Sequence, residues 1–167
     1  AYMQSIPRVF SRDADGRHEH EFLADIFPSL KTMATAIFLK GYQWTFDPRR
    51  IGKFQSSLID ILVFNERRKG RRVFLDFRRN PVGAPGMGAF RLKDLAPEAA
   101  GYLLGAGALQ KTPLERLAHM NPLAVEIFRE NGIDLSGEPL EVDVCAQHNN
   151  GGFAVNPWWE SGLRHTF

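Results

Sequence analysis

Hydrophobic and polar positions follow two different periods in the first quarter of the chain. Residues 6–11 have the composition of a strand, and the sequence Asp-Ala-Asp-Gly at 13–16 predicts a hairpin turn with residues 17–22 as the return strand. Over residues 23–40 the apolar positions recur at helical spacing, and Gly41 is expected to end that helix. The predicted apolar stripe consists of Phe27, Leu30, Met33, Ala34, Ile37 and Phe38.

A second helix is predicted to begin after Asp47. Asp47 can act as its N-cap and Pro48 can occupy the first helical position, with the helix ending near Asn65. The basic run at 67–72 is expected to be a solvated turn that leads into a strand at 73–77. The apolar face of this helix is predicted to carry Ile51, Phe54, Leu58, Ile61, Leu62 and Phe64.

The sequence of the second half of the chain predicts shorter helices. Residues 81–88 read as a loop, and residues 92–104 form a weaker helix candidate that starts around Pro97. A helical region over 112–130 opens with a capping signal, and Pro122 is expected to divide it. The last predicted strand covers 140–146. Helices dominate and the strands are short, which predicts an α+β fold with a small, mostly antiparallel sheet.

Composition narrows the class of protein. The chain has 167 residues, 44% of them hydrophobic and 24% charged, as in one ordinary globular domain. Its net charge of +2, with dispersed arginines, disfavours nucleic acid as a partner. A single cysteine excludes an intrachain disulfide. Without an apolar run long enough for a membrane span or a signal peptide, a cytoplasmic location is expected.

A polar run at 145–156 is the strongest candidate for chemistry. Its glycines allow close backbone approach to a flat ligand, its asparagines offer donors and acceptors, and its histidine can bind a carboxylate or move a proton. The alternative is a surface hairpin whose glycines and asparagines only make the turn. Cys145 lies near the histidine, but two ligands are too few for a metal site. The candidate residues are His148, Asn149, Asn150, Gly151 and Gly152.

Two further histidines, His18 and His20, alternate with acidic residues in the predicted hairpin. They fit an exposed hairpin face better than a metal site, because the sequence offers no evident third ligand nearby.

Three segments resemble, in order and spacing, the substrate-capping domain of the fumarate reductase and succinate dehydrogenase flavoproteins. The first is the Pro48-Arg49-Arg50 helix start, and the second is Gly-Arg-Arg-Val-Phe-Leu-Asp-Phe-Arg at 70–78. The third is 148–152, which resembles the segment in which a histidine precedes a Gly-Gly pair. The resemblance implies an oxidoreductase that uses FAD to transfer a hydride to or from a small-molecule substrate activated by a carbonyl or carboxylate.

The resemblance also implies a role for each candidate residue. Arg49, or alternatively Arg50, would transfer a proton, which requires unusual surroundings because a free guanidinium has a very high pKa. The competing interpretation places both arginines on the solvent side of a helix start, without a catalytic role. His148 would bind the substrate, with Asn149 and Asn150 orienting it, and Gly151 and Gly152 would lie against the flavin.

The cofactor itself is expected to be held elsewhere. A dinucleotide-binding strand, Gly-x-Gly-x-x-Gly turn and helix are not evident, and the glycine-rich 83–88 segment reads as a loop. We therefore expect residues 1–144 to be a capping domain and 145–167 to return towards an FAD-binding domain of the same protein. This chain alone is expected to bind flavin poorly and to be inactive.

The substrate is left open by the sequence. The Thr-Glu pair and the Arg-Gly-Glu-Gly-Gly run of dicarboxylate-specific members do not occur at 1–8, which puts succinate and fumarate in doubt. Gln43, Trp44 and the pair Trp158-Trp159 indicate larger or more apolar ligands, although such aromatic residues more often serve packing.

Two other functions compete with this interpretation. The first is a non-catalytic interaction module that uses the basic run at 67–72 to bind an acidic partner. The second is an NAD-type dehydrogenase, which the absence of a phosphate-binding loop disfavours.

Overall fold

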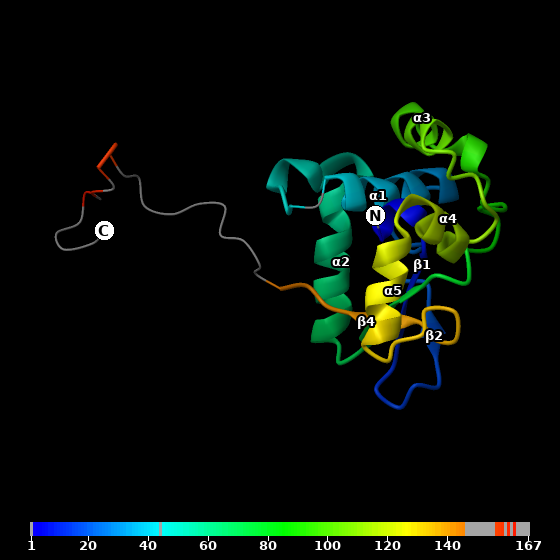
Figure 1. Cartoon of the computed structure of the whole chain (residues 1–167). Coiled ribbons are helices and arrows are strands. Elements are labelled where there is room, and N and C mark those ends of the chain that lie inside the picture. The colour runs from blue at the N-terminus through cyan, green and yellow to red at the C-terminus, as the bar shows by residue number, and fades with distance from the viewer. Residues whose placement is uncertain (1, 44, 146–155, 159, 161, 163–167) are drawn as a thin grey trace.

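A small antiparallel sheet and a set of helices form the fold, as the computed structural model in Figure 1 shows. The structure describes residues 2–43, 45–145, 156–158, 160 and 162. The sheet has the strand order β2-β1-β3-β4, and every pairing in it is antiparallel. The predicted α+β class with a small, mostly antiparallel sheet is confirmed.

The strands are β1 (Arg8–Arg12), β2 (Glu19–His20), β3 (Arg72–Asp76) and β4 (Leu140–Val142). The α-helices are α1 (Leu30–Tyr42), α2 (Ser56–Arg68), α3 (Pro97–Gly105), α4 (Pro113–Met120) and α5 (Pro122–Glu130). Short 3-10 turns are η1 (Met3–Ser5), η2 (Pro48–Arg50), η3 (Gly52–Phe54) and η4 (Leu92–Asp94).

The N-terminal hairpin forms as predicted, with Ser11 opposite His20, but both strands are shorter than expected. The first strand begins only at Arg8, because Ile6 ends η1 in the left-handed region with φ 58°. The return strand is reduced to Glu19–His20. Strand propensity therefore predicts strands that are too long, because the η1 turn and the 13–18 loop limit their length.

Helix α1 begins at Leu30, so the predicted start at residue 23 is wrong. Ser29 is the N-cap, and its side-chain oxygen accepts a hydrogen bond from the backbone N–H of Thr32. Gly41 does not end the helix but lies inside it. A Cβ at this position would lie 2.7 Å from the backbone nitrogen of Gln4, so glycine allows η1 to pack closely against α1.

The second predicted helix is broken where the sequence predicted continuity. Two 3-10 turns precede α2, and Lys53 and Phe54 in the second of them, η3, adopt left-handed conformations with φ 55° and 58°. Because α2 starts only at Ser56, the predicted apolar stripe does not become its buried face, and Phe64 is exposed. The residues that α2 buries are Ser56, Ser57, Ile59, Val63 and Glu66.

Replacing Lys53 by glycine is expected to stabilise the protein by about 0.5–1 kcal/mol. A non-glycine residue in the left-handed conformation costs about 1–2 kcal/mol. Glycine removes this cost, but its greater conformational freedom in the unfolded chain cancels part of the gain. Urea unfolding of Lys53→Gly against the wild type measures the gain. Lys53→Ala is the matched control, because it removes the same side chain without relieving the backbone, and an equal gain in both variants would contradict the strain.

The C-terminal helices follow their local signals. Thr112 and Glu115 form the predicted capping box at the start of α4. The predicted break at Pro122 is confirmed, and Asn121 caps α5 by accepting a hydrogen bond from the N–H of Ala124. The weaker helix candidate is reduced to η4 and α3.

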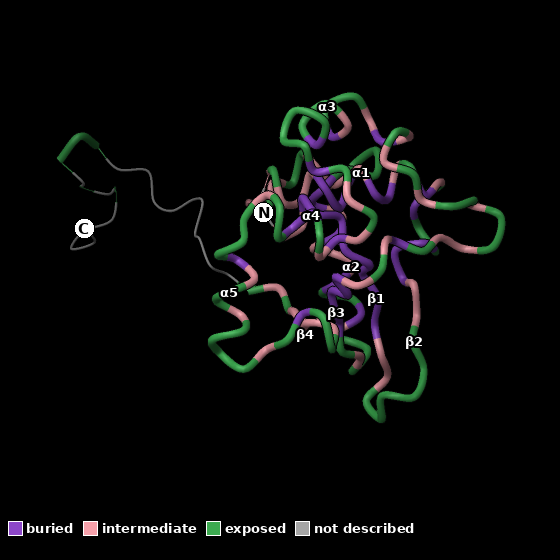
Figure 2. Tube along the Cα trace, turned by 45° about the vertical axis from the view of Figure 1, so that its right-hand side comes forward, coloured by how far each residue is buried: buried purple, intermediate pink, exposed green. Residues whose placement is uncertain are grey.

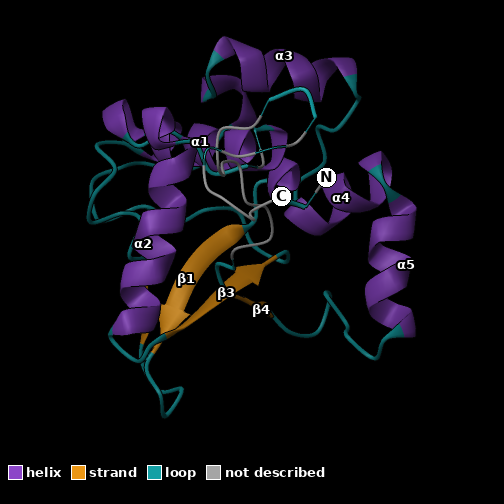
Figure 3. Ribbon diagram, turned by 90° about the vertical axis from the view of Figure 1, so that its left-hand side faces the viewer, coloured by secondary structure: helices purple, strands orange, loops and turns teal. Residues whose placement is uncertain are grey.

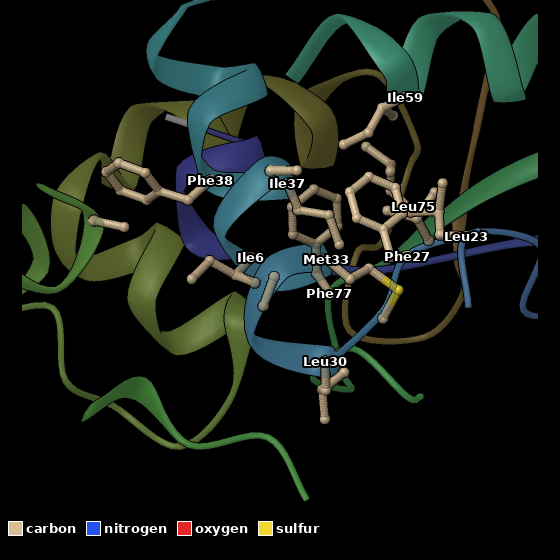
Figure 4. Packing of buried hydrophobic residues seen from close by; sticks show 14 of the residues in the cluster. Ile6, Leu23, Phe27, Leu30, Met33, Ile37, Phe38, Ile59, Leu75 and Phe77 are labelled. Carbon is tan, nitrogen blue, oxygen red and sulfur yellow. The ribbon is translucent and has the colours of Figure 1, made fainter. Parts of the chain in front are cut away.

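One face of the sheet packs on the main core. Val9, Val73 and Leu75 alternate with residues of the opposite face and join the apolar side chains of α1 and α2. Figure 2 shows buried positions concentrated along these elements, and Figure 4 shows Met33 and Ile37 of α1 pointing toward Phe77 and its neighbours. The helix-covered face therefore supplies most of the hydrophobic stabilisation.

The other face of the sheet is built differently. Phe10 and Phe74 lie opposite each other and stack with 5.5 Å between ring centroids. The guanidinium groups of Arg8, Arg12 and Arg72 lie over these rings at 4.1 to 5.3 Å. Cationic side chains thus cover aromatic residues that belong to the sheet but not to the main core.

None of the helices described combines the length and apolarity needed to cross a membrane.

Candidate functional site

The two predicted catalytic arginines lie on the connection between α1 and α2. Both belong to the three-residue turn η2 and not to the start of an α-helix, because η3 separates them from α2. The Arg49 side chain is 89% exposed, and that of Arg50 is 35% exposed. Arg49 therefore faces solvent, as the non-catalytic interpretation expected.

Asp47 holds the Arg49 guanidinium in one orientation. Its carboxylate accepts hydrogen bonds from the backbone N–H of Arg49 at 3.0 Å, from Nε at 3.1 Å and from Nη2 at 3.0 Å. The Nε atom of Arg50 lies 3.8 Å from the same carboxylate. The backbone N–H of Asp47 donates to the hydroxyl of buried Ser57, at 2.9 Å, which ties the whole arrangement to the first turn of α2.

This pairing shifts the pKa of both partners. The hydrogen bonds from Arg49 hold the pKa of Asp47 below its ordinary value. In return, the hydrogen bond to Asp47 raises the pKa of Arg49 above its ordinary value. The surroundings of Arg49 therefore favour a permanent cation, the opposite of what proton transfer by a guanidinium requires.

The predicted substrate- and flavin-contacting residues, His148, Asn149, Asn150, Gly151 and Gly152, lie outside the described residues. The chain leading to them is anchored at Asp143, whose carboxylate accepts a hydrogen bond from Nε of Arg67 at 2.7 Å.

Arg67 belongs to the last turn of α2, whereas Arg49 precedes the first turn. Helix α2, which Figure 3 shows along its whole length, has 13 residues and is about 20 Å long. The anchor in its last turn and Arg49 before its first turn therefore lie near its opposite ends. His148 is five positions after Asp143, which corresponds to at most about 18 Å of extended chain. The described residues therefore do not bring the two predicted parts of the site together.

The basic run at 67–72 is not a set of free cations. Arg67 and Arg72 both pair with Glu141 on β4, with Arg72 at 2.5 Å, and Lys69 and Arg71 pair with Glu66 at 2.7 and 3.1 Å. Four of its five basic side chains are therefore engaged in the fold. Arg68 takes part in none of the described ion pairs, and its guanidinium lies 5.9 Å from the ring centroid of Phe64.

The hairpin turn brings two carboxylates close to His18, which the sequence did not reveal, whereas His20 does not belong to this group. Ligand atoms of Asp13, Asp15 and His18 all lie within 4.8 Å of one another. Asp13 accepts hydrogen bonds from the backbone N–H and the Nδ1 position of His18, at 3.0 and 2.7 Å. Arg17 lies 3.5 Å from Asp15. These contacts satisfy the acidic groups as parts of an exposed turn.

A cavity of about 350 Å³ lies at the other end of α1. It is lined by Ser29, Leu30 and Lys31 at the start of the helix and by residues of the 87–95 segment. Arg49 and Arg50 follow the far end of α1, so this cavity is separate from the predicted site.

The structure describes only some of the residues named as possible contacts of a larger ligand, which are Gln43 and three tryptophans. Gln43 uses its side-chain oxygen to accept a hydrogen bond from Ser56, so it helps to join α1 to α2. Trp158 is exposed, and Trp44 and Trp159 lie outside the described residues.

The sequence predicts Asp47 as a helix cap, and the structure shows that Asp47 is also the ionic partner of Arg49. The available signal was the Asp-x-Arg spacing, which allows a carboxylate to accept from the backbone and the side chain two residues later. The same spacing at Asp15 and Arg17 produces a similar contact in the hairpin turn.

Comparison of the chain with protein-family models, with curated proteins and with solved structures finds no match.

Proposed function

We propose that this chain is the substrate-capping part of an FAD-dependent oxidoreductase similar to the fumarate reductase flavoproteins. The observation that carries the proposal is the exposed Arg49 guanidinium, fixed by Asp47 on the segment that matches the first of the three family-like motifs. A cap contributes charged groups of this kind when it closes over a cofactor held by another domain.

The described residues do not form a cradle for FAD. All described strand pairings are antiparallel, so they lack the parallel-sheet edge at which dinucleotides bind. The glycine-rich 83–88 segment is a loop between β3 and η4 and does not lead directly from a strand into a helix, as a dinucleotide-binding turn does. We therefore assign FAD to a separate domain of the same protein.

The residues of this chain would then bind and orient the small-molecule substrate. Arg49 and Arg50 supply positive charge at the surface that faces the substrate, and His148 with Asn149 and Asn150 would complete the binding site. Gly151 and Gly152 would let the backbone approach the ring system. When bound, a flavin supplies the hydride acceptor or donor.

The internal ion pairs disfavour the competing interaction module. An acidic partner would have to compete with Glu66, Glu141 and Asp143 for the side chains of the 67–72 run. The geometry therefore supports a capping role better than a basic docking surface.

The test uses the complete polypeptide in which this chain occurs. We expect the purified protein to show the visible absorbance of an oxidised flavin and to reduce or oxidise a carboxylate-bearing substrate. Arg49→Ala is expected to lower kcat/KM by a factor of about 100 or more, as for loss of one preorganised charged group. Arg68→Ala is the control and should change kcat/KM less than about twofold. A protein that contains no flavin, or equal effects of both substitutions, would refute the proposed function.

A further inference from the structure

Asp47 leaves one edge of the Arg49 guanidinium open. The carboxylate contacts the edge formed by Nε and Nη2, and Nη1 makes no hydrogen bond among the described residues. A guanidinium presents planar, paired donors on its other edge, formed by Nη1 and Nη2, which match the two oxygens of a carboxylate. The fixed orientation and the 89% exposure of Arg49 direct this edge toward an incoming ligand.

The anchoring of Asp47 makes the arrangement rigid. Its backbone is held by Ser57, which is fully buried in the first turn of α2, and Pro48 restricts the backbone between the acid and the arginine. A side chain as long as arginine otherwise loses rotamer freedom when it binds a ligand. The Asp47 pair restricts that freedom before the ligand arrives, which favours binding.

The same contact makes Arg49 a poor proton carrier. A group that donates and recovers a proton works best when its pKa lies near the working pH, and Asp47 shifts the pKa of Arg49 in the opposite direction. A permanently charged, oriented guanidinium is instead suited to binding an anion.

We infer that Asp47 is a positioning residue that holds Arg49 as a receptor for a substrate carboxylate. This inference rests on the proposed function and deepens it, because it gives Asp47 a positioning role and places proton transfer on a group other than Arg49.

The first experiment uses this chain and no flavin. In ¹⁵N NMR spectra of the arginine side chains, succinate and benzoate are added separately, and the Nε–H signal of Arg49 is followed. We expect a saturable shift with at least one carboxylate in the wild type and its loss in Asp47→Asn. Asparagine keeps an oxygen that can cap the turn but removes the charged pair.

Asp15→Asn is the matched control for this experiment. Asp15 and Arg17 share the Asp-x-Arg spacing in another exposed turn, so this variant should leave the Arg49 response unchanged. If the wild-type Arg49 signal does not respond to either carboxylate, the inference is overturned, whatever the enzyme does.

The second experiment measures kinetics in the complete flavoprotein. Asp47→Asn is expected to raise KM for the carboxylate substrate about tenfold, because an Arg49 side chain that is no longer held loses more rotamer freedom when it binds the substrate, while kcat changes less than about threefold. Asp47→Glu, which restores a carboxylate, should recover part of the affinity. A fall in kcat with unchanged KM would instead make Arg49 the proton carrier and overturn the inference.

The two experiments separate this inference from the proposed function. If the complete protein lacks flavin but Arg49 still responds to carboxylates in an Asp47-dependent way, the oxidoreductase proposal fails and the receptor survives. If flavin chemistry is present and neither readout changes in Asp47→Asn, the receptor fails and the oxidoreductase proposal survives.

Discussion

Replacing Arg116 by methionine is expected to lower the free energy of unfolding by about 3–5 kcal/mol, because one buried acceptor and several half-buried acceptors lose their donors at once. The Arg116 side chain on α4 is fully buried. Its Nε donates to the backbone oxygen of Ser5 at 2.9 Å, its Nη1 to that of Gln110 at 2.7 Å, and its Nη2 to the side-chain oxygen of Asn80 at 2.7 Å. One guanidinium thus joins three segments that are distant in the sequence.

The charge of Arg116 is not balanced by a carboxylate among the described ion pairs. Burial lowers its pKa to about 10, with a small opposing effect from Glu115. The residue still remains protonated at neutral pH, and neutral oxygens supply its hydrogen bonds. Methionine removes the cost of burying the charge but leaves the carbonyl groups unsatisfied, and the second effect is expected to dominate.

Urea unfolding of Arg116→Met measures this loss. Arg129→Met is the matched control, because Arg129 is an exposed helical arginine that pairs only with Glu126 among the described residues, and its loss should change the free energy by less than about 0.5 kcal/mol. Arg116→Lys should fall between them, since an ammonium group cannot reach all of the acceptors. Equal stability of Arg116→Met and Arg129→Met would show that water satisfies the carbonyl groups.

Features that depend on neighbours in the sequence could be predicted. Thr112, Pro122 and the hairpin turn at 13–16 act within a few residues of themselves, and each prediction at these positions is confirmed. The start of α1 also has a local signal, Pro28 followed by the Ser29 cap, but the apolar spacing over 23–27 continues the helical pattern upstream of it and so predicts a start that is too early. In the structure Phe27 is buried from a turn and not from a helix.

Features that depend on distant partners could not be predicted in the same way. Arg116 and Glu66 are polar residues on amphipathic helices, where periodicity places such residues in solvent. Their burial depends on Ser5, Asn80 and Ser11, which the fold brings from 111, 36 and 55 positions away.

The candidate site shows the same division. The Asp47–Arg49 contact lies within one turn and could be read from the sequence, but its effect on the charge of Arg49 required the geometry. The relation of Arg49 to residues 148–152 depends on how the chain continues beyond Asp143, and it stays a prediction. The NMR and kinetic experiments on Asp47 therefore address the part of the site that the described residues define.

Glu66 is expected to be the second residue whose loss strongly destabilises the fold. Its carboxylate is buried at the end of α2, where it accepts hydrogen bonds from Ser11 at 2.6 Å and Lys69 at 2.7 Å and pairs with Arg71 at 3.1 Å. Glu66→Ala is expected to lower the free energy of unfolding by about 3 kcal/mol, because Arg71 and Ser11 lose their buried partner. The carboxylate therefore joins α2 to β1 and to the turn before β3.

The contribution of Glu66 has a defined pH dependence. Burial alone would raise the pKa of Glu66, but the hydrogen bonds from Lys69 and Ser11 outweigh it, so the pKa lies below the ordinary value of 4.5. The unfolded chain then binds more protons than the folded one below that pH, and stability increases with pH in this range. The stabilisation is fully present above pH 4.5 and is lost as the pH falls through the pKa of the folded state.

Unfolding by urea at a series of pH values between about 3 and 7 tests this in the wild type and in Glu66→Gln. Glutamine keeps the size of the side chain and an acceptor for Ser11 but does not titrate, so the variant should lose less stability on acidification than the wild type. Some dependence of stability on pH will persist in Glu66→Gln, because the pKa values of Asp76 and Glu19 are also lowered. Burial opposes this shift at both residues, and hydrogen bonds from arginine side chains outweigh the effect of burial. Glu126→Gln, at an exposed pair with Arg129, should follow the wild-type curve. Parallel curves for Glu66→Gln and the wild type would mean that the buried carboxylate titrates at the same pH in both states, so that its ion pairs only offset the cost of burying it.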